Sequence, residues 1–439
     1  MAYLLNFVYL LLLVLCSPWL LYAAIRKGKY REGLGAKFMG RVPQRTGTGR
    51  CVWLHAVSVG EINVLGPLLL HLEQEHPTWE CVISTTTKTG YALARKKYAP
   101  RHVFYCPLDF SWAVHRALRS VRPDLLLLVE LELWPNLIWA AQRQDTKVAI
   151  VNGRLSEHSA RGYRRIRPLV AAVLRSLDLV AVQNAEYAER FRQLGAPPET
   201  VHVTGSIKFD GAETDRSNPR TQRLAAIWGL QLEDVVFLAG STQHPEEALA
   251  LEVFRQLVPN YPHLRLILTP RHPERFAEVA ELLDRCGLPW QRRSTLETQG
   301  PNPEARVLLI DTIGELAAWW GAARIAYVGG SMGRRGGQNM IEPAAYGAAV
   351  SFGPNTNNFR DVVAMLLDRQ AAVVVHDADE LTAFVRRCIE EPAFAEELGR
   401  RSQQLVNEQL GAAKRTSQLI GALFEIDPDR SSRLTATSA

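Results

Sequence analysis

The chain has 439 residues, of which 47% are hydrophobic and 22% charged, with a formal net charge of +6. This length and hydrophobicity predict two domains with large cores in addition to a membrane anchor. The basic residues form no concentrated patch with aromatic residues, which argues against a nucleic-acid partner and suits anionic lipid or a phosphorylated substrate. The six cysteines include no C-x-x-C pair, so we expect reduced structural thiols in a cytoplasmic compartment and no zinc site.

The N-terminal segment from Tyr3 to Ile25 contains no charged residue and is rich in Leu, Val and aromatic residues. It is long enough to cross a bilayer core of about 30 Å. Four basic residues within 26–31 follow at once, which predicts that this flank stays cytoplasmic. The length of the run and the lack of a basic start argue against a cleaved signal peptide. Pro18 interrupts the run, so a kinked or shallow interfacial anchor stays open beside a spanning helix.

Short apolar runs then alternate with helical patterns. Several runs are apolar at every position, which is typical of a parallel sheet covered on both faces. The predicted strands of this half are Val52–Ala56, Cys81–Thr85, Val103–Tyr105, Leu125–Val129, Lys147–Asn152, Leu179–Gln183 and Val201–Thr204. The predicted helices include Ile62–Glu75, Gly90–Tyr98 and Ala113–Ser120.

The turn from His55 to Glu61 joins the first predicted strand to the first predicted helix. Such turns lie at the carboxyl edge of an open α/β sheet, where ligands bind, so Glu61 is a candidate base. Ser58 and Glu61 also have the S-x-x-E spacing of a capping box, and these residues alone favour a purely structural cap. We expect the helix dipole to lower the pKa of Glu61.

Charged residues follow two further predicted strands of this half. Glu130 and Glu132 come after a strand of leucine and valine, where an unpaired buried charge is costly. A functional role and pairing with a nearby arginine are both open for them. Lys208 follows the last strand of this half, where a solvated lysine is the usual interpretation.

Hydrophobicity lapses around 210–220, which predicts a domain boundary. The pattern then restarts with predicted strands Val235–Ala239, Leu264–Thr269, Val307–Asp311, Ile325–Val328, Ala349–Phe352 and Ala372–Val375. Two such βαβ series predict an α/β protein with two Rossmann-like halves facing a cleft. We expect an anchor over 1–27, a first domain over 28–212, a second over 213–426 and a disordered tail over 427–439.

A glycine-rich stretch from Gly329 to Pro343 follows a predicted strand and precedes a helix. Its glycines let backbone amides approach an anion, and the helix N-terminus adds positive potential. Arg334 and Arg335 strengthen this prediction of ligand binding over a simple flexible turn. Glu342 is placed to hydrogen-bond the vicinal hydroxyls of a ribose.

Three further strand ends carry polar residues. Arg271 has the geometry to bind a phosphate through two nitrogens, although a lone arginine more often forms a surface ion pair. Asp311 and Thr312 are candidate N-caps of the helix that follows them. Asp377 and Asp379 have the D-x-D spacing that holds a metal beside a sugar nucleotide, but a helix cap explains them better. The sequence contains no H-x-x-x-H pair and no Walker P-loop.

Eight motifs follow one another in a characteristic order. They are HAVSVGE at 55–61, VELELWPN at 129–136, VNGRLS at 151–156, TGSIKFD at 204–210, TPRHPER at 269–275, DTIGEL at 311–316, YVGGS at 327–331 and GGQNMIEPAAYG at 336–347. As a set they resemble the Kdo transferases, the 3-deoxy-D-manno-octulosonic acid transferases of lipopolysaccharide synthesis. The resemblance runs from the anchor to about residue 410. It implies a GT-B glycosyltransferase with the acceptor domain first and the nucleotide domain second.

The resemblance also implies the substrates and the location. The donor would be CMP-Kdo, and the acceptor would be lipid IVA, the precursor of lipid A. A single N-terminal anchor would hold the catalytic domains on the cytoplasmic side of the inner membrane. Similar enzymes need no metal in the active site, and no cofactor is implied.

The family's functional residues fall on matching positions of this chain. Its base falls on Glu61, and its proposed transition-state stabilisers fall on Glu130 and Lys208. Its CMP contacts fall on Pro270, Arg271, Ile313, Gly314, Glu315, Asn339, Met340, Ile341 and Glu342. Two departures are small: Ile313 replaces a common methionine, and Met340-Ile341 replace the frequent Pro-Leu.

The chemistry of these residues agrees with the implied reaction. Glu61 would deprotonate a glucosamine hydroxyl, which attacks the anomeric carbon of Kdo from the face opposite CMP. Glu130 would stabilise positive charge on the sugar, while Arg271, Lys208 and the loop 330–337 would stabilise the departing phosphate.

Three alternative functions compete with this interpretation. Another membrane-associated GT-B glycosyltransferase that uses a UDP-sugar on a lipid acceptor stays open, since its fold would be the same. A catalytically silent glycolipid-binding protein needs no acid at the cleft. A dehydrogenase needs a strand–GxGxxG–helix fingerprint, which the sequence lacks.

Overall fold

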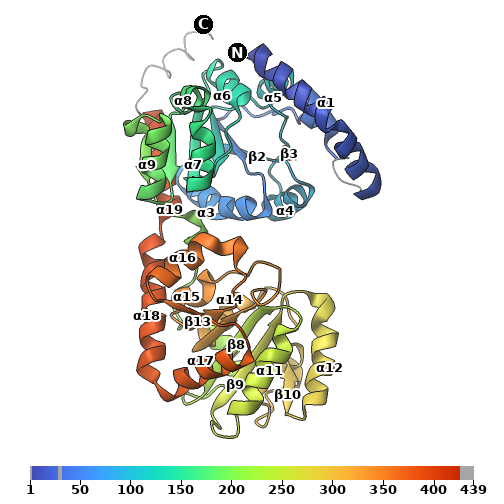
Figure 1. The fold of residues 1–439 in the computed structure, drawn as a ribbon, viewed down its shortest axis with the longest axis vertical. Coiled ribbons are helices and arrows are strands. Elements are labelled where there is room, and N and C mark those ends of the chain that lie inside the picture. The colour runs from blue at the N-terminus through green and yellow to red at the C-terminus, as the bar shows by residue number, and fades with distance from the viewer. Residues whose placement is uncertain (1, 28–31, 426–439) are drawn as a thin grey trace. The chain divides into compact units, whose positions relative to one another are not determined.

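The computed structural model describes residues 2–27 and 32–425. The chain forms two compact units. The first contains the chain up to Asp210 together with the part from Gln409 onward, and the second is Gly211–Glu408. Each unit is built on a seven-stranded sheet (Figure 1). All strand pairs are parallel, which confirms the predicted α/β class with two Rossmann-like halves.

The sheet of the first unit has the strand order β3-β2-β1-β4-β5-β6-β7. Its strands are β1 (Cys51–His55), β2 (Glu80–Thr85), β3 (Val103–Tyr105), β4 (Leu125–Val129), β5 (Lys147–Gly153), β6 (Leu179–Val182) and β7 (Val201–Val203). All seven predicted strands are present. The order reverses between β1 and β4, so the carboxyl ends of these two strands form the switch point of the sheet, where open α/β folds bind ligands.

Helices cover both faces of this sheet. Its helices are α1 (Ala2–Lys27), α2 (Leu34–Met39), α3 (Val59–Glu75), α4 (Lys88–Tyr98), α5 (Ser111–Val121), α6 (Pro135–Gln142), α7 (Glu157–Arg164), α8 (Arg167–Leu174), α9 (Ala185–Leu194) and α19 (Ala412–Glu425). Successive side chains of a strand point to opposite faces. Trp53 therefore packs with residues of α5, α6, α8 and α9, whereas Leu54 packs with residues of α3, α4 and α19.

The sheet of the second unit has the order β10-β11-β9-β8-β12-β13-β14. Its strands are β8 (Val235–Thr242), β9 (Leu264–Pro270), β10 (Trp290–Arg292), β11 (Val307–Leu309), β12 (Ile325–Val328), β13 (Ala349–Phe352) and β14 (Ala372–Val374). The sequence prediction missed β10, because this three-residue edge strand is only half-buried and has no apolar run. The other six predicted strands are present.

The helices of the second unit are α10 (Pro219–Ile227), α11 (Glu246–Leu257), α12 (Phe276–Cys286), α13 (Leu296–Gln299), α14 (Leu316–Ala322), α15 (Ile341–Ala345), α16 (Arg360–Asp368), α17 (Ala378–Glu390) and α18 (Pro392–Gln409). Residues of α11, α12 and α17 share one core with β8 and β9. Asp377 is the N-cap of α17 and accepts the Glu380 N–H at 2.9 Å, which confirms the cap interpretation of this acid.

The structure corrects the predicted extent of the second domain, 213–426. Helix α19 belongs to the first unit, where it contacts α3. The Asp210 carboxylate accepts the Gly411 N–H at 2.6 Å, and Ser417 donates to Glu75 at 2.6 Å. This return of the chain is set by tertiary contacts, which hydrophobic periodicity does not reveal. The predicted tail, 427–439, lies outside the described residues.

The predicted apolar segment forms one continuous helix, α1, with Pro18 inside it. Within residues 2–27 and 32–425, α1 is the one helix that is long and apolar enough to cross a membrane, judged by length and composition. Only 6% of its apolar window Ala2–Trp19 is buried. Helix α1 contacts α5 of the first unit (Figure 1).

Candidate functional site

Glu61 lies in the first turn of α3, directly after the carboxyl end of β1. Ser58 is the N-cap: its Oγ accepts the Glu61 N–H at 3.3 Å, and its own N–H donates to Glu61 Oε1 at 3.3 Å. The predicted capping box is therefore confirmed. The Val57 N–H donates to Glu61 Oε2 at 2.8 Å, so both carboxylate oxygens are held in a fixed orientation.

Burial raises the pKa of the Glu61 carboxyl, and the nearby charge of Glu130 acts in the same direction. Hydrogen bonds from Val57 and Ser58 oppose this rise in pKa without cancelling it. The expected lowering of this pKa by the helix dipole is wrong, because desolvation of a carboxylate that is only 9% exposed has the larger effect. A raised pKa makes the carboxylate a better proton acceptor near neutral pH.

Glu130 and Lys208 form an ion pair, with 3.0 Å between Oε1 and Nζ. Glu130 follows β4, and Lys208 lies on the short 3-10 helix η2 (Ile207–Phe209) after β7. The sequence left an arginine partner open for Glu130 and indicated a solvated side chain for Lys208. The structure instead pairs these two residues with each other. Glu130 also has a left-handed backbone with φ of 61°, a conformation that is uncommon for non-glycine residues and enriched at functional sites.

Asn152 holds the segment that carries Lys208. It lies near the carboxyl edge of β5 with φ of 54°, is fully buried, and accepts the Ile207 N–H on Oδ1 at 3.0 Å. Gln183 in turn donates to the Asn152 carbonyl at 3.1 Å. Sequence reasoning gave Asn152 no role. The available signal was an amide residue at the end of an otherwise apolar strand, where a buried polar group needs a partner.

Glu132 is the third acid at this edge. Burial raises the pKa of its carboxyl to about 7, and the charges of Glu61 and Glu130 add to the rise. Trp134 Nε1 donates to Glu132 at 2.9 Å, which acts in the opposite direction. The sequence analysis noted that an unpaired buried charge at Glu132 costs free energy. With a pKa of about 7 the carboxyl is partly protonated near neutral pH, which lowers this cost.

We expect Glu132→Gln to increase stability in mildly alkaline solution. The folded-state pKa of about 7 lies above the usual 4.5, so the folded protein binds this proton more tightly than the unfolded chain. The wild type therefore loses stability as the pH rises from about 4.5 to about 7, whereas the amide does not ionise. At about pH 8 the unfolding free energy of the variant should be higher by about 1–2 kcal/mol, after allowance for solvent screening.

Chemical denaturation at about pH 5 and about pH 8 measures this effect. The difference between variant and wild type should be small at the lower pH. An equal difference at both pH values would contradict a titrating Glu132.

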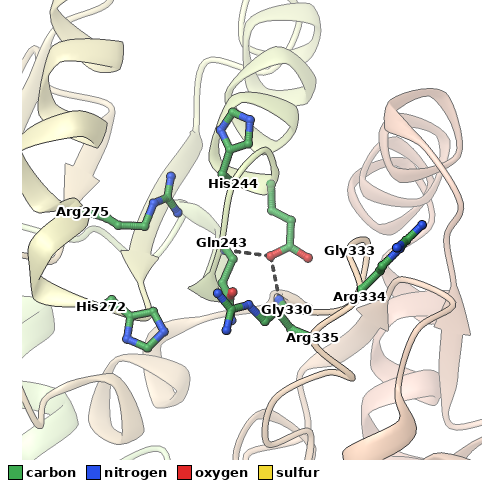
Figure 2. A pocket seen from close by; sticks show the side chains of 9 residues that line it. Gln243, His244, His272, Arg275, Gly330, Gly333, Arg334 and Arg335 are labelled. Atoms are coloured by element: carbon green, nitrogen blue, oxygen red, sulfur yellow. Dashed lines mark hydrogen bonds between the residues drawn. The ribbon is translucent and has the colours of Figure 1, made fainter. Parts of the chain in front are cut away.

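The second unit contains a pocket of about 470 Å³ at the carboxyl ends of its central strands (Figure 2). The strand order reverses between β8 and β12, so this pocket lies at the switch point of the second sheet. Its lining residues are Gln243, His244, Glu246, His272, Arg275, Gly330, Gly333, Arg334 and Arg335.

Glu246 forms the floor of this pocket and is 1% exposed. Its carboxylate accepts hydrogen bonds from the backbone N–H groups of Gln243 (2.8 Å), Gly330 (2.6 Å), Ser331 (2.9 Å) and Met332 (2.9 Å) and from the hydroxyl of Tyr327 (3.0 Å). Figure 2 draws the bonds from Gln243 and Gly330 as dashed lines. The loop 330–337 is expected to stabilise a departing phosphate. Its first amides, those of residues 330–332, already bind a carboxylate of the protein.

The walls of this pocket are basic. Arg275 pairs with Glu247 and with Glu278 (2.9 Å), which fixes its guanidinium at 17% exposure. Arg334 and Arg335 come from the other side and are exposed (Figure 2). Sequence reasoning missed Arg275 and the acids of α11. The signal was two adjacent acids, Glu246 and Glu247, on a helix that follows a buried strand, since acids buried this deeply need partners.

Part of the predicted CMP site comes together at the start of α15. Asn339 Nδ2 donates to Glu342 Oε1 at 3.1 Å. Burial raises the pKa of the Glu342 carboxyl, while the Asn339 bond and the charge of Arg271 oppose the rise. Arg271, Asn339 and Glu342 are therefore neighbours. Met340 and Ile341 are buried, and Pro270 ends β9 one residue before Arg271.

The other part of the predicted CMP site is the loop before α14. Glu315 is held by Arg293, whose Nε lies 2.9 Å from Oε2, and by the Thr312 hydroxyl at 2.7 Å. Gly314 has φ of 88°, and Ile313 is 82% exposed. Because α14 and α15 contact each other, the two parts of the predicted site lie at the starts of adjacent helices.

The predicted N-cap of α14 is wrong. Asp311 instead accepts the Ser294 N–H at 2.9 Å and the Ser294 hydroxyl at 2.7 Å, and α14 has no side-chain cap. Within residues 2–27 and 32–425, no three His, Cys, Asp or Glu side chains are grouped as metal ligands.

Solved structures of other proteins have a similar fold. UDP-GlcNAc 2-epimerase from Neisseria meningitidis has a similar structure, with a TM-score of 0.55 and 15% identity, covering 84% of this chain and 99% of that chain. A glycosyltransferase from Rickettsia africae is similar with a TM-score of 0.53 and 10% identity, covering 85% of this chain and 98% of that chain. The chain thus has the GT-B fold, with one apolar N-terminal helix in addition.

Sequence relatives define the family. The family described as 3-deoxy-D-manno-octulosonic-acid transferase (kdotransferase) matches residues 32–211. The 3-deoxy-D-manno-octulosonic acid transferase of Haemophilus influenzae is 33% identical over 428 residues, covering 96% of this chain and 99% of that protein. The enzyme of the same name from Bordetella pertussis is 35% identical over 376 residues, covering 83% and 85%. The chain therefore belongs to the Kdo transferases and is a glycosyltransferase.

Proposed function

We propose that the protein transfers Kdo from CMP-Kdo to lipid IVA, with inversion at the anomeric carbon, on the cytoplasmic side of the inner membrane. The observation that carries the proposal is the grouping of Glu61 with the Glu130–Lys208 ion pair at the switch point of the first sheet. In a Kdo transferase these groups supply a base and a stabilising charge pair at one sheet edge.

Glu61 is the general base of the proposed reaction. It takes the proton of an acceptor hydroxyl while the oxygen bonds to the anomeric carbon and the bond from that carbon to the phosphate oxygen breaks. The electron pair of the broken bond leaves with CMP. The capping box supports this role, because it orients the carboxylate, and burial keeps its pKa above the usual value.

Charge develops on both sides of the breaking bond. The Glu130 carboxylate stabilises positive charge on the sugar, and the Lys208 ammonium stabilises the departing phosphate. In the second unit, Arg271, Asn339 and Glu342, together with the loop 313–315, bind CMP. A monophosphate leaving group requires less neutralisation than a diphosphate, so these cations serve without a metal.

Helix α1 is proposed to hold the enzyme at the membrane. Its exposed side chains are large and apolar, and burying such surface in lipid is favourable by about 25 cal/mol per Å². Incubation of the full chain with CMP-Kdo and lipid IVA, followed by mass spectrometry of the lipid, tests the proposed donor and acceptor. We expect product heavier by one or more Kdo residues. Unchanged lipid with CMP-Kdo, but a modified lipid with a UDP-sugar, would refute it.

A second prediction concerns donor recognition. CMP should raise the thermal midpoint of the protein more than UDP does, because the nucleotide that binds the folded protein more tightly stabilises it more. A ligand at about 100 times its Kd stabilises by about 2.7 kcal/mol. Arg271→Gln should weaken CMP binding by about tenfold or more, since a charge-assisted bond to phosphate is lost. The matched control is Arg285→Gln on α12, where the arginine is 73% exposed. Equal midpoint shifts for CMP in both variants would contradict the assignment of Arg271.

A further inference from the structure

A second pocket, of about 500 Å³, lies inside the first unit between α1 and the loops that follow β3 and β4. One wall is formed by Leu12, Leu13 and Cys16 of α1. The opposite wall contains Leu131, Leu133 and Trp134, which follow β4. The pocket is therefore largely apolar, and the N-terminal helix is part of it.

Buried polar contacts fasten α1 at this place. Asn6 is 7% exposed, donates to Ser111 Oγ at 2.7 Å and accepts the Ser111 N–H at 3.0 Å. The Tyr9 hydroxyl donates to Asp109 Oδ2 at 3.0 Å. A helix that served only as a membrane tether would not need directional bonds to the catalytic unit. The wall formed by α1 thus has a defined position relative to the opposite wall.

The inner end of this pocket reaches the acid cluster of the site. Glu132 lines the pocket, and it lies close enough to Glu61 and Glu130 for their charges to act on it. The ring of Trp134 also lies 6.1 Å from the ring of His55, the last residue of β1. A molecule that fills the pocket and reaches Glu61 therefore has an apolar part joined to a hydroxyl-bearing part.

The other side of α1 is apolar and exposed. Phe7, Leu11, Val14 and Leu15 are each at least half exposed, at 64%, 50%, 66% and 67%. If this side faces lipid, as the proposed function requires, the pocket wall and the lipid-facing surface belong to the same helix. Hydrocarbon from the membrane then reaches the pocket without crossing water.

We propose that this pocket receives an acyl chain of the lipid acceptor, so that α1 forms a wall of the acceptor site as well as an anchor. The proposal rests on the proposed function and adds the place where the lipid part binds. The acceptor is favoured over bulk phospholipid because of position. The pocket ends at Glu132, beside Glu61, where the hydroxyl of the acceptor has to lie for the proposed reaction.

The test compares an acylated with a deacylated acceptor. Leu13→Trp fills the pocket, and Leu11→Trp places the same ring on the exposed side of the same helix. With lipid IVA in detergent micelles, Leu13→Trp should raise KM by about tenfold or more, because several methylenes lose their apolar contacts. With the deacylated glucosamine disaccharide, kcat/KM should be unchanged. Leu11→Trp should change neither value.

Cys16→Trp, at another position of the same wall, should repeat the pattern of Leu13→Trp if that variant fails to fold. Three results would overturn the proposal: a lowered kcat/KM for both acceptors, no change with either acceptor, or an equal effect of Leu11→Trp. The proposed function is judged separately by the wild type. If the wild type transfers no Kdo to either acceptor, the proposed function fails. If it transfers Kdo to both and the variants do not discriminate, only the pocket assignment fails.

Discussion

Glu61→Gln should lower kcat by about 10²–10⁴-fold and leave the protein folded. The reason is chemical, since an amide of the same shape does not accept the proton of the acceptor hydroxyl. Glutamine also satisfies the capping box, so the start of α3 should persist. Steady-state transfer assays, together with the thermal midpoint, measure the two effects in one preparation.

Two controls separate the base from the cap. Glu73→Gln changes an exposed acid of the same helix and should leave kcat unchanged. Ser58→Ala removes the N-cap hydroxyl and should cost about 1 kcal/mol of stability, with a smaller loss of rate than Glu61→Gln. If Glu61→Gln keeps most of its turnover, Glu61 is only a cap.

The largest effect on stability should come from Glu246→Ala, with a loss of about 3–5 kcal/mol. The substitution leaves four backbone N–H groups, two of them buried, and the buried Tyr327 hydroxyl without their acceptor. Glu246→Gln should lose nearly as much, because its amide NH₂ would face N–H donors. Chemical denaturation monitored by circular dichroism gives the free energies.

The matched control for Glu246 is Glu252→Ala, an exposed acid on the same helix, which should change stability by less than about 0.5 kcal/mol. If Glu246→Ala loses as little stability as Glu252→Ala, water replaces the carboxylate in the loop. The floor of the pocket would then be open to an anion after all.

The sequence was sufficient for the sheets, because their central strands are apolar at every position and this pattern is typical of parallel strands buried on both faces. It was insufficient for β10, whose residues Trp290–Arg292 are half-exposed and lack an apolar run. The capping box of Glu61 was readable, since both partners lie within one turn. The sign of its pKa shift was not, because burial depends on residues distant in sequence.

The sequence analysis failed mainly to predict which groups the charged side chains contact. Lys208 follows Glu130 by a long stretch of chain, and only the strand order β4-β5-β6-β7, with the turn after β7, brings them together. The glycine loop was predicted to bind a ligand anion, and its first amides bind the carboxylate of Glu246 of α11. No local pattern connects Glu246 with Gly330.

The return of α19 to the first unit has a consequence for biosynthesis. The apolar side chains of Ala413 and Ile420 complete a layer of the first core, yet they are synthesised only after the whole of the second unit. The second unit is contiguous and can close while translation continues, as domains generally do. The first unit cannot complete its core until α19 has been made. A nascent chain stalled before residue 412 would therefore expose one side of a finished sheet to chaperones.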